Sequence, residues 1–337
     1  MINIEMKWKH IICYSRKRWD TIHDASSVFI FLNTPEHSIH FNFFFFLRHF
    51  LKLLLIILLI IIIICFFFLR VNEKKGCCNE SSEECDIKFS IKDVVTQYDK
   101  EAQEVVETTI RSKFPSHMFL GEEDVPAGGE ASIKALRDIL ANTKDNYIWI
   151  VDPIDGTANF ASGLDLCGVT VTVVKDNKAL IGVIYDPHKD EMFTAIDGKG
   201  AYCNGERIYA TSQIDTVQDA IINAGCPADP NAFAASMRGV MAMNSKCRGI
   251  RILACSALTL AWVASGRLGG HYGYDLSSWD LIAGALIVQE ADGIITDLNG
   301  SPYTIETRNM LVCANTGIHT EILDILHTAD AVSFERV

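Results

Sequence analysis

The sequence predicts a layered α+β fold for most of the chain, and three observations support this. Apolar residues recur at helical spacing in several segments, and three consecutive β-type runs in the middle of the chain are separated by turn residues. Helices and strands also alternate without the strict strand–helix–strand order of a doubly wound sheet. At 337 residues the chain is long enough to bury a sizeable core.

The first part of this region is predicted to contain two helices and two strands. Thr96 can cap the first helix. Ala102, Val105, Val106 and Ile110 recur at helical spacing, and Pro115 ends that helix. In chain order, we expect a helix over residues 99–113, a strand over 118–120, a helix over 130–141 and a strand over 147–151.

The second part begins with an antiparallel meander and continues with helices. Turn clusters separate the three β runs, which cover residues 169–175, 179–185 and 191–195. The elements expected after them are helices over residues 232–243, 257–264 and 278–291 and a strand over 293–297.

Residues 1–86 differ from the rest and are treated as an atypical extension, with a second region over residues 87–337. From Leu53 to Leu69 the chain contains only Leu, Ile, Phe and one Cys. One interpretation is a transmembrane helix over about residues 50–69, which would make this a single-pass membrane protein. The other is a mis-predicted exon, because translated pyrimidine-rich DNA has this composition, and the protein would then be cytoplasmic.

Charge and cysteine content exclude several classes of function. A net charge of -12 argues against nucleic-acid binding, which uses clustered Lys and Arg. The six cysteines beyond residue 86 form no Cys-x-x-Cys pair, so the sequence indicates neither a zinc site nor a disulfide scaffold.

The segment from Trp149 to Thr157 delivers two carboxylates from an apolar strand into a turn. Asp152, the Ile154 carbonyl and Asp155 can converge there as oxygen ligands, which Mg²⁺ prefers. The backbone N–H groups of Gly156 and Thr157 are suited to a phosphate oxygen. An ordinary Asp-Pro and Asp-Gly turn is the alternative.

Other carboxylates also lie where elements begin or end. Glu122 and Glu123 follow a strand, and Asp99 and Asp280 each start a helix. Taken singly, each fits a solvated surface or a helix cap.

Together these residues resemble the inositol monophosphatase family, a class of magnesium-dependent, lithium-sensitive phosphatases. The matching segments are Asp93-Val94-Val95-Thr96-Gln97-Tyr98-Asp99, Gly121-Glu122-Glu123, Asp152-Pro153-Ile154-Asp155-Gly156-Thr157 and Trp279-Asp280-Leu281-Ile282-Ala283-Gly284-Ala285. The resemblance covers about residues 88–330. It implies an αβαβα sandwich of the type shared with fructose-1,6-bisphosphatase, and a homodimer.

The resemblance also implies a site with two or three Mg²⁺ ions. Glu122, Asp152 and the Ile154 carbonyl would hold the first ion. Asp152, Asp155 and Asp280 would hold the second. The implied catalytic residues are Asp99, Thr157 and Glu122, with Asp99 and Thr157 orienting and deprotonating the attacking water. The implied substrate contacts are Asp155, Gly156, Thr157, Ser256 and Asp275.

The substrate implied is a small phosphorylated polyol or sugar, first of all inositol 1-phosphate. Family members carry an acidic residue that contacts inositol at the position of Gly273, and glycine cannot make that contact. Galactose 1-phosphate, histidinol phosphate and a nucleotide 3'-phosphate are therefore alternatives, as is a non-catalytic metal- or phosphate-binding protein on this fold. His117 and His271 are interpreted as structural or rim residues.

Overall fold

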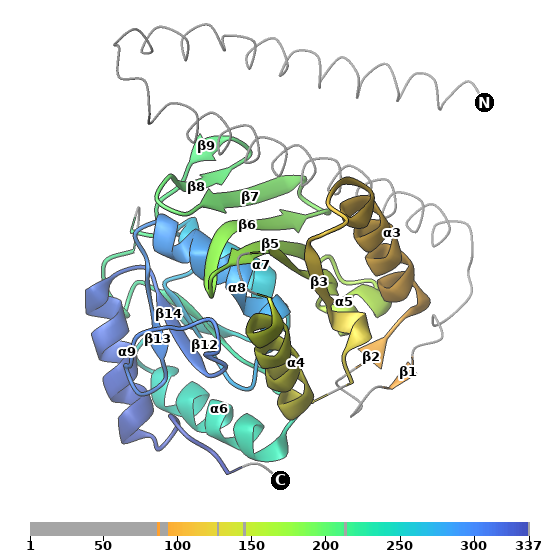
Figure 1. Cartoon of the computed structure of the whole chain (residues 1–337). Coiled ribbons are helices and arrows are strands. Elements are labelled where there is room, and N and C mark those ends of the chain that lie inside the picture. Colours follow the sequence, from red (N-terminus) through yellow and green to blue (C-terminus); the bar gives the residue numbers. More distant parts are fainter. Residues whose placement is uncertain (1–85, 88–93, 127, 144–145, 212–213, 336–337) are drawn as a thin grey trace, which may run out of the picture. The chain divides into compact units, whose positions relative to one another are not determined.

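Two large β-sheets, a two-stranded sheet and the helices around them make up the described part of the chain, shown as a computed structural model in Figure 1. The structure describes residues 86–87, 94–126, 128–143, 146–211 and 214–335. The expected transmembrane helix over residues 50–69, like the rest of the region before Asp86, lies outside these ranges. Within them, no helix combines the length and the apolar character needed to cross a bilayer.

The larger sheet has seven strands in the order β3-β4-β5-β6-β7-β8-β9. β3 and β4 are parallel, and all later neighbours are antiparallel. The strands are β3 (Met118–Gly121), β4 (Ile148–Asp155), β5 (Gly168–Lys175), β6 (Lys178–Asp186), β7 (Glu191–Ile196), β8 (Gly200–Cys203) and β9 (Glu206–Arg207). β5, β6 and β7 are the predicted meander, which is confirmed. β4 and β5 are buried along nearly their whole length because both faces of the sheet are covered.

The smaller sheet has five strands in the order β11-β10-β12-β14-β13. β10 is parallel to β11 and β12, whereas β14 is antiparallel to β12 and β13. The strands are β10 (Ile221–Ala224), β11 (Gly249–Arg251), β12 (Gly270–Gly273), β13 (Ile294–Asp297) and β14 (Met310–Cys313). Of these the sequence predicts only β13, because runs of three or four residues are too short to show alternation. A separate pair joins β1 (Asp86–Ile87) to β2 (Val94–Val95).

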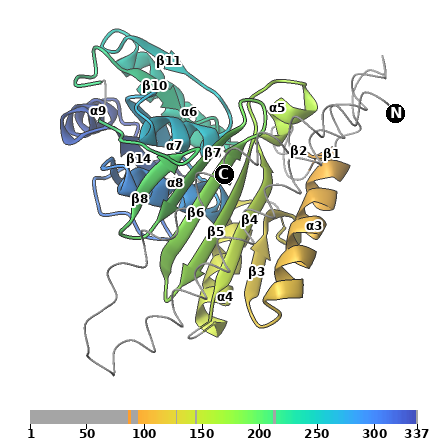
Figure 2. The same ribbon diagram turned by 90° about the horizontal axis from the view of Figure 1, so that it is seen from above.

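Helices separate and cover the two sheets. Figure 2 shows α7 (Ser256–Ala264) and α8 (Ser278–Glu290) between them. α4 (Gly129–Asn142) belongs to the same layer, since Leu136 packs in one cluster with Trp279 and Ile282 of α8. α7 and α8 are apolar on all sides, as expected for helices buried between layers.

The outer faces of the sheets carry the remaining long helices. α3 (Gln97–Lys113) packs against the larger sheet, and α6 (Pro230–Met243) and α9 (Thr316–Thr328) cover the smaller one. The layers therefore follow the order helix, sheet, helix, sheet, helix, and the predicted αβαβα sandwich is confirmed. α9 is absent from the predicted elements, although Ile318, Ile322 and Ile325 recur at helical spacing and Asn315 caps it.

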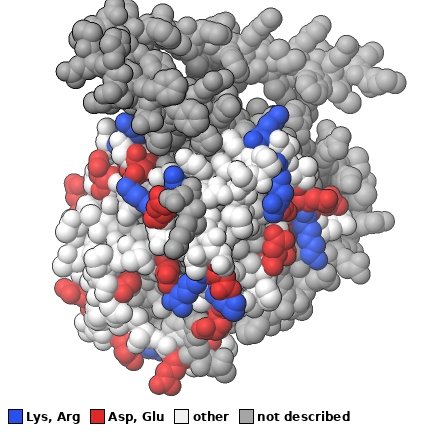
Figure 3. All heavy atoms as spheres, viewed as in Figure 1, with Lys and Arg blue, Asp and Glu red and all other residues white. Residues whose placement is uncertain are grey.

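Charged side chains of both signs are interspersed on the face viewed in Figure 3. Several form exposed ion pairs, such as Arg137 with Glu306 at 2.8 Å and Lys178 with Asp197 at 2.7 Å. Pairs of this kind contribute little to stability. The described part of this face presents no continuous basic surface.

Candidate active site

β4 brings the two carboxylates of the Asp152–Asp155 segment to one side of the larger sheet. The sequence predicts that this strand ends at Val151, but it continues to Asp155. Residues three apart in a regular strand point to opposite faces. Here the register against β5 shifts between Asp152, which pairs with Thr170, and Asp155, which pairs with Gly168. The extra residue on β4 forms a bulge, which changes the direction in which the side chains after it point.

Asp280, in the first turn of α8, is the third carboxylate beside Asp152 and Asp155. Its carboxylate accepts a hydrogen bond from the Ser277 N–H at 2.8 Å, so it closes a capping box as well as facing the cluster. One ligand oxygen from each of Asp152, Asp155 and Asp280 lies within 4.8 Å of the other two. The structure therefore brings these three residues together, and their role as ligands of one metal ion stays a prediction.

Burial and mutual repulsion make this cluster electrostatically unfavourable without a cation. Burial, followed by the charges of Glu122, Asp155 and Asp280, raises the pKa of Asp152. Burial also raises the pKa of Asp155 to about 6, although the Ala257 N–H and the Cys255 thiol donate hydrogen bonds to its carboxylate. The three donors are hard oxygens, two on buried residues and one on the half-buried Asp280, so this residue set fits a divalent cation such as Mg²⁺.

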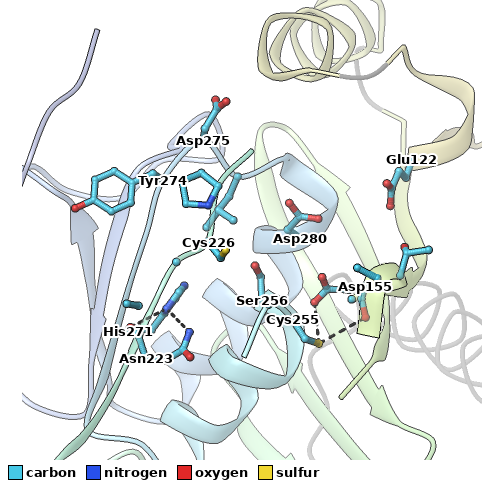
Figure 4. A pocket seen from close by; sticks show the side chains of 18 residues that line it. Glu122, Asp155, Asn223, Cys226, Cys255, Ser256, His271, Tyr274, Asp275 and Asp280 are labelled. Atoms are coloured by element: carbon cyan, nitrogen blue, oxygen red, sulfur yellow. Dashed lines mark hydrogen bonds between the residues drawn. The ribbon is translucent and has the colours of Figure 1, made fainter. Parts of the chain in front are cut away.

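Glu122 and the Ile154 carbonyl lie beside the cluster. Glu122 begins a short 3₁₀ helix, η2 (Glu122–Asp124), which follows β3, and Figure 4 shows its side chain at the same end of the pocket as Asp155. The Ile154 oxygen lies 3.0 Å from the Thr157 hydroxyl, whose single proton can be donated either to this oxygen or to Asp99. Their roles as metal ligands stay predictions.

Asp99 and Thr157 are brought together as predicted. Thr157 Oγ1 lies 3.2 Å from Asp99 Oδ1. The other carboxylate oxygen, Asp99 Oδ2, accepts hydrogen bonds from the Thr96 N–H at 2.8 Å and the Thr96 hydroxyl at 2.6 Å. Burial raises the pKa of Asp99, and the hydrogen bonds from Thr96 oppose this shift. Asp99 is thus both a capping-box residue of α3 and a partner of Thr157.

Gly156 allows the turn that follows β4. It has φ +87° and ψ 36°, a left-handed conformation that glycine adopts without strain. The Gly156 N–H group contributes to lowering the pKa of Asp155, against the larger effect of burial. The role of the Gly156 amide as a phosphate donor stays a prediction. Thr157 then starts the short helix α5 (Thr157–Ala161).

A cavity of about 240 Å³ opens beside the cluster. Glu122, Asp155, Thr157 and Asp280 line one end of it, and the predicted substrate contacts Gly156, Ser256 and Asp275 also line it. Asp275 Oδ1 accepts a hydrogen bond from Arg308 Nη2 at 3.0 Å. Figure 4 shows this carboxylate directed away from Ser256. The charge of Asp275 is therefore paired with a cation, and its role as a substrate contact stays a prediction.

Further lining residues come from the smaller sheet and are missing from the predicted site. Asn223 on β10 and His271 on β12 are register partners, and both line the cavity with Cys226. His271, interpreted as a structural or rim residue, is buried and lies in the cavity wall. No local sequence signal marks these residues, because their strands are too short to be recognised and they meet only through strand pairing.

Comparisons with known proteins agree with this architecture. The model of the "Inositol monophosphatase family" matches residues 65–331, so the match begins ahead of the predicted boundary at residue 87. Inositol monophosphatase 1 of Solanum lycopersicum is 35% identical over 244 residues, which span 72% of this chain and 85% of the relative. Inositol monophosphatase 1 of Bos taurus is 32% identical over 231 residues, or 68% and 80% of the two chains.

A solved structure shows the same likeness. The extragenic suppressor protein suhB from Bartonella henselae has a TM-score of 0.70 and 27% identity, and the match covers 82% of this chain and 98% of that one. The layered fold with a carboxylate cluster at its centre, together with these relatives, defines a phosphoric monoester hydrolase. The chain belongs to the inositol monophosphatase family.

Proposed function

We propose that this enzyme hydrolyses a small phosphorylated polyol or sugar, with myo-inositol 1-phosphate as the first candidate, by direct attack of water on phosphorus. The observation that carries the proposal is the convergence of Asp152, Asp155 and Asp280 beside a cavity that Thr157 also lines. A family of phosphatases that includes the inositol monophosphatases of Solanum lycopersicum and Bos taurus supports the reaction class.

The acidic residues would hold the metal. Two or three Mg²⁺ ions, held by Glu122, Asp152, the Ile154 carbonyl, Asp155 and Asp280, would supply the positive charge that draws in the phosphate, activates water and stabilises the leaving oxygen. This explains how an acidic protein can accept an anionic substrate. The chain itself contributes the fixed positions of these oxygens, since β4 and α8 are buried and the N-terminus of α8 is closed by a capping box.

Thr157 and Asp99 would handle the proton of the attacking water. The Thr157 hydroxyl can donate to Asp99 Oδ1 while its lone pair accepts from a water in the cavity. Asp99 then takes the proton that Thr157 passes on. Because Thr96 holds the other oxygen of Asp99 by two hydrogen bonds, the carboxylate keeps its orientation throughout. No covalent intermediate is required.

A panel of phosphate esters tests the proposal. Phosphate release is measured with Mg²⁺ and with chelator on myo-inositol 1-phosphate, galactose 1-phosphate, histidinol phosphate and a nucleotide 3'-phosphate. We expect release that requires Mg²⁺ and is fastest on a polyol or sugar phosphate. Asp324→Asn, a substitution of an exposed carboxyl on α9, is a matched control and should leave the rates unchanged. Binding of Mg²⁺ without release from any ester would contradict hydrolysis and favour a non-catalytic binding protein.

The organisation of the whole chain belongs to the same proposal. We place the catalytic domain within residues 87–337, preceded by the extension over residues 1–86, and we expect a homodimer as in the family. Size-exclusion chromatography with light scattering tests the dimer, and a monomer at micromolar concentration would contradict it.

A further inference from the structure

His271 presents a buried nitrogen without a partner at the cavity wall. The side chain is only 2% exposed and lines the cavity. Its Nδ1 lies 3.0 Å from Asn223 Nδ2, whereas its Nε2 has no hydrogen-bond partner among the described residues. Buried polar atoms are almost always hydrogen-bonded, so an orphan in a cavity wall points to a partner that a ligand supplies.

The hydrogen-bond network indicates which nitrogen carries the proton. The Leu253 N–H donates to Asn223 Oδ1 at 3.1 Å, so the amide group of Asn223 must turn its Nδ2 donor towards His271 Nδ1. The Asn223 backbone oxygen lies 3.2 Å from the same Nδ1, slightly farther than the amide. Burial lowers the pKa of His271 to about 4, so the ring is neutral near pH 7. An Nδ1 that accepts from the Asn223 amide leaves the single ring proton on Nε2, whereas an Nδ1–H that donates to the Asn223 backbone oxygen would leave Nε2 without a proton.

Because residue 273 is a glycine, no side chain at that position fills the space next to His271 Nε2. A Cβ at position 273 would lie 3.0 Å from His271 Nε2 and 2.5 Å from Leu276 Cδ1. Leu276 also lines the cavity, and its Cδ1 atom lies close to the same point as this nitrogen. A ligand that displaces the end of Leu276, a flexible side chain, reaches the Nε2–H group.

The position of this donor relates it to the alcohol part of the substrate. Figure 4 shows Asn223 and His271 on the opposite side of the pocket from Glu122 and Asp155. A phosphate held at the acidic end therefore directs its alcohol part towards β10 and β12.

We propose that the Nε2–H of His271 donates a hydrogen bond to a hydroxyl or ring oxygen of the substrate's alcohol part, which makes His271 a specificity-determining residue for phosphorylated polyols and sugars. This inference rests on the proposed phosphatase function. A neutral N–H group in a buried wall donates to an oxygen lone pair and disfavours an ammonium group, which has only donors. The subsite thus offers a donor close to where the family is expected to offer an acidic acceptor.

A pair of variants and a pair of substrates test this role. His271→Met replaces the ring with an apolar side chain that has no donor. His271→Gln retains an N–H donor near the position of Nε2. The substrates are the polyol or sugar phosphate that the enzyme hydrolyses fastest, and phenyl phosphate, whose alcohol part has no further oxygen. His271→Met should lower kcat/KM for the first about five- to tenfold, mainly through KM, and change it less than twofold for phenyl phosphate.

Rescue separates a specific contact from a structural role. His271→Gln should recover at least half of the wild-type kcat/KM on the polyol or sugar phosphate. Equal losses on both substrates, or no loss on the polyol or sugar phosphate, would overturn the proposal. Phenyl phosphate therefore serves as the internal control for correct folding of the variants.

A measurement that does not depend on turnover keeps this inference distinct from the phosphatase activity. In ¹H–¹⁵N spectra of the histidine rings, the signals of His271 are assigned by their loss in His271→Met. We expect a protonated Nε2 whose resonance moves when myo-inositol and inorganic phosphate are added with Mg²⁺. A proton on Nδ1, or an unmoved Nε2, would overturn the subsite even in an active enzyme. A moved Nε2 in a protein that releases no phosphate would overturn the proposed hydrolysis and retain the subsite.

Discussion

Thr157 Oγ1 lies 3.2 Å from Asp99 Oδ1, although 58 residues separate the two in the chain. One residue begins the helix after the bulged end of β4, and the other lies in the first turn of α3. α3 packs against β4, which explains why these two helix starts meet. A hydroxyl joined to a buried carboxylate beside a cluster of metal-type ligands is an arrangement suited to removing a proton from water.

Replacing the Thr157 hydroxyl should affect the chemical step more than binding. Thr157→Val keeps the shape of the side chain but removes the proton path to Asp99. We expect kcat to fall about 100-fold with KM changed less than threefold. Thr157→Ser keeps the hydroxyl and should retain most of the activity. Steady-state kinetics on the substrate that the enzyme hydrolyses fastest measure kcat and KM. A rise in KM at unchanged kcat would assign Thr157 to binding instead.

Mg²⁺ should stabilise the folded protein through the acidic cluster. At about 100 times its Kd, a ligand that binds only the folded state adds about 2.7 kcal/mol to the free energy of unfolding. The melting temperature should then rise by about 5–10 °C. Asp280→Asn removes one of the three converging carboxylates while the asparagine can still cap α8, so its shift should be much smaller. A shift of equal size in Asp280→Asn, measured by thermal denaturation, would place the stabilising ion elsewhere.

His271 should make the folded protein sensitive to mild acid. Burial lowers the pKa of His271 from 6.5 to about 4, so between these values the unfolded chain binds a proton that the folded protein excludes. The contribution of neutral, buried His271 to the free energy of unfolding is complete above pH 6.5 and is lost as the pH falls towards 4. At pH 5 the loss is about 2 kcal/mol. Asp99, Asp152 and Asp155, whose pKa values are raised, act in the opposite direction.

The variant His271→Met isolates this effect, because the carboxylates are the same in both proteins. Its stability should change less than that of the wild type between pH 7 and pH 5, as measured by chemical denaturation. An identical pH dependence in the two proteins would show that His271 is protonated normally when folded.

Gly156 should be intolerant of a side chain. A Cβ there would lie 2.7 Å from the Leu166 carbonyl oxygen, and the left-handed backbone costs a non-glycine residue about 1–2 kcal/mol. Gly156→Ala should therefore lower the free energy of unfolding by more than this backbone cost. It should also displace Thr157 and so lower the activity at least tenfold. Gly163→Ala is a matched control, since Gly163 has φ +75° but no atom near the added carbon. Activity that survives in both variants would show that the turn is not needed for the site.

The sequence predicts the larger sheet and its site residues better than the smaller sheet. β5, β6 and β7 are long and separated by clear turns, and Asp152 and Asp155 stand in a recognisable segment. The bulge that places both carboxylates on one side is not predictable from local pattern, because it depends on pairing with β5.

Two further features required the tertiary structure. Asp280 closes a helix cap, which local pattern allows, and it also completes the carboxylate cluster, which only the packing of α8 against β4 makes possible. Asn223 and His271 carry no motif and meet only because β10 and β12 are neighbours. Their strands are four residues long, too short for alternation to reveal which side chains face the cavity.

The central claim is that phosphate release depends on a metal held by the converging carboxylates. The most direct test is phosphate release from myo-inositol 1-phosphate as Mg²⁺ is titrated into the wild type and into Asp280→Asn. We predict saturable, Mg²⁺-dependent release by the wild type and a rate at least 100-fold lower in Asp280→Asn, a loss expected for removal of a ligand from a metal site that activates water. Release that needs no divalent metal, or that Asp280→Asn retains, would contradict this account of the site.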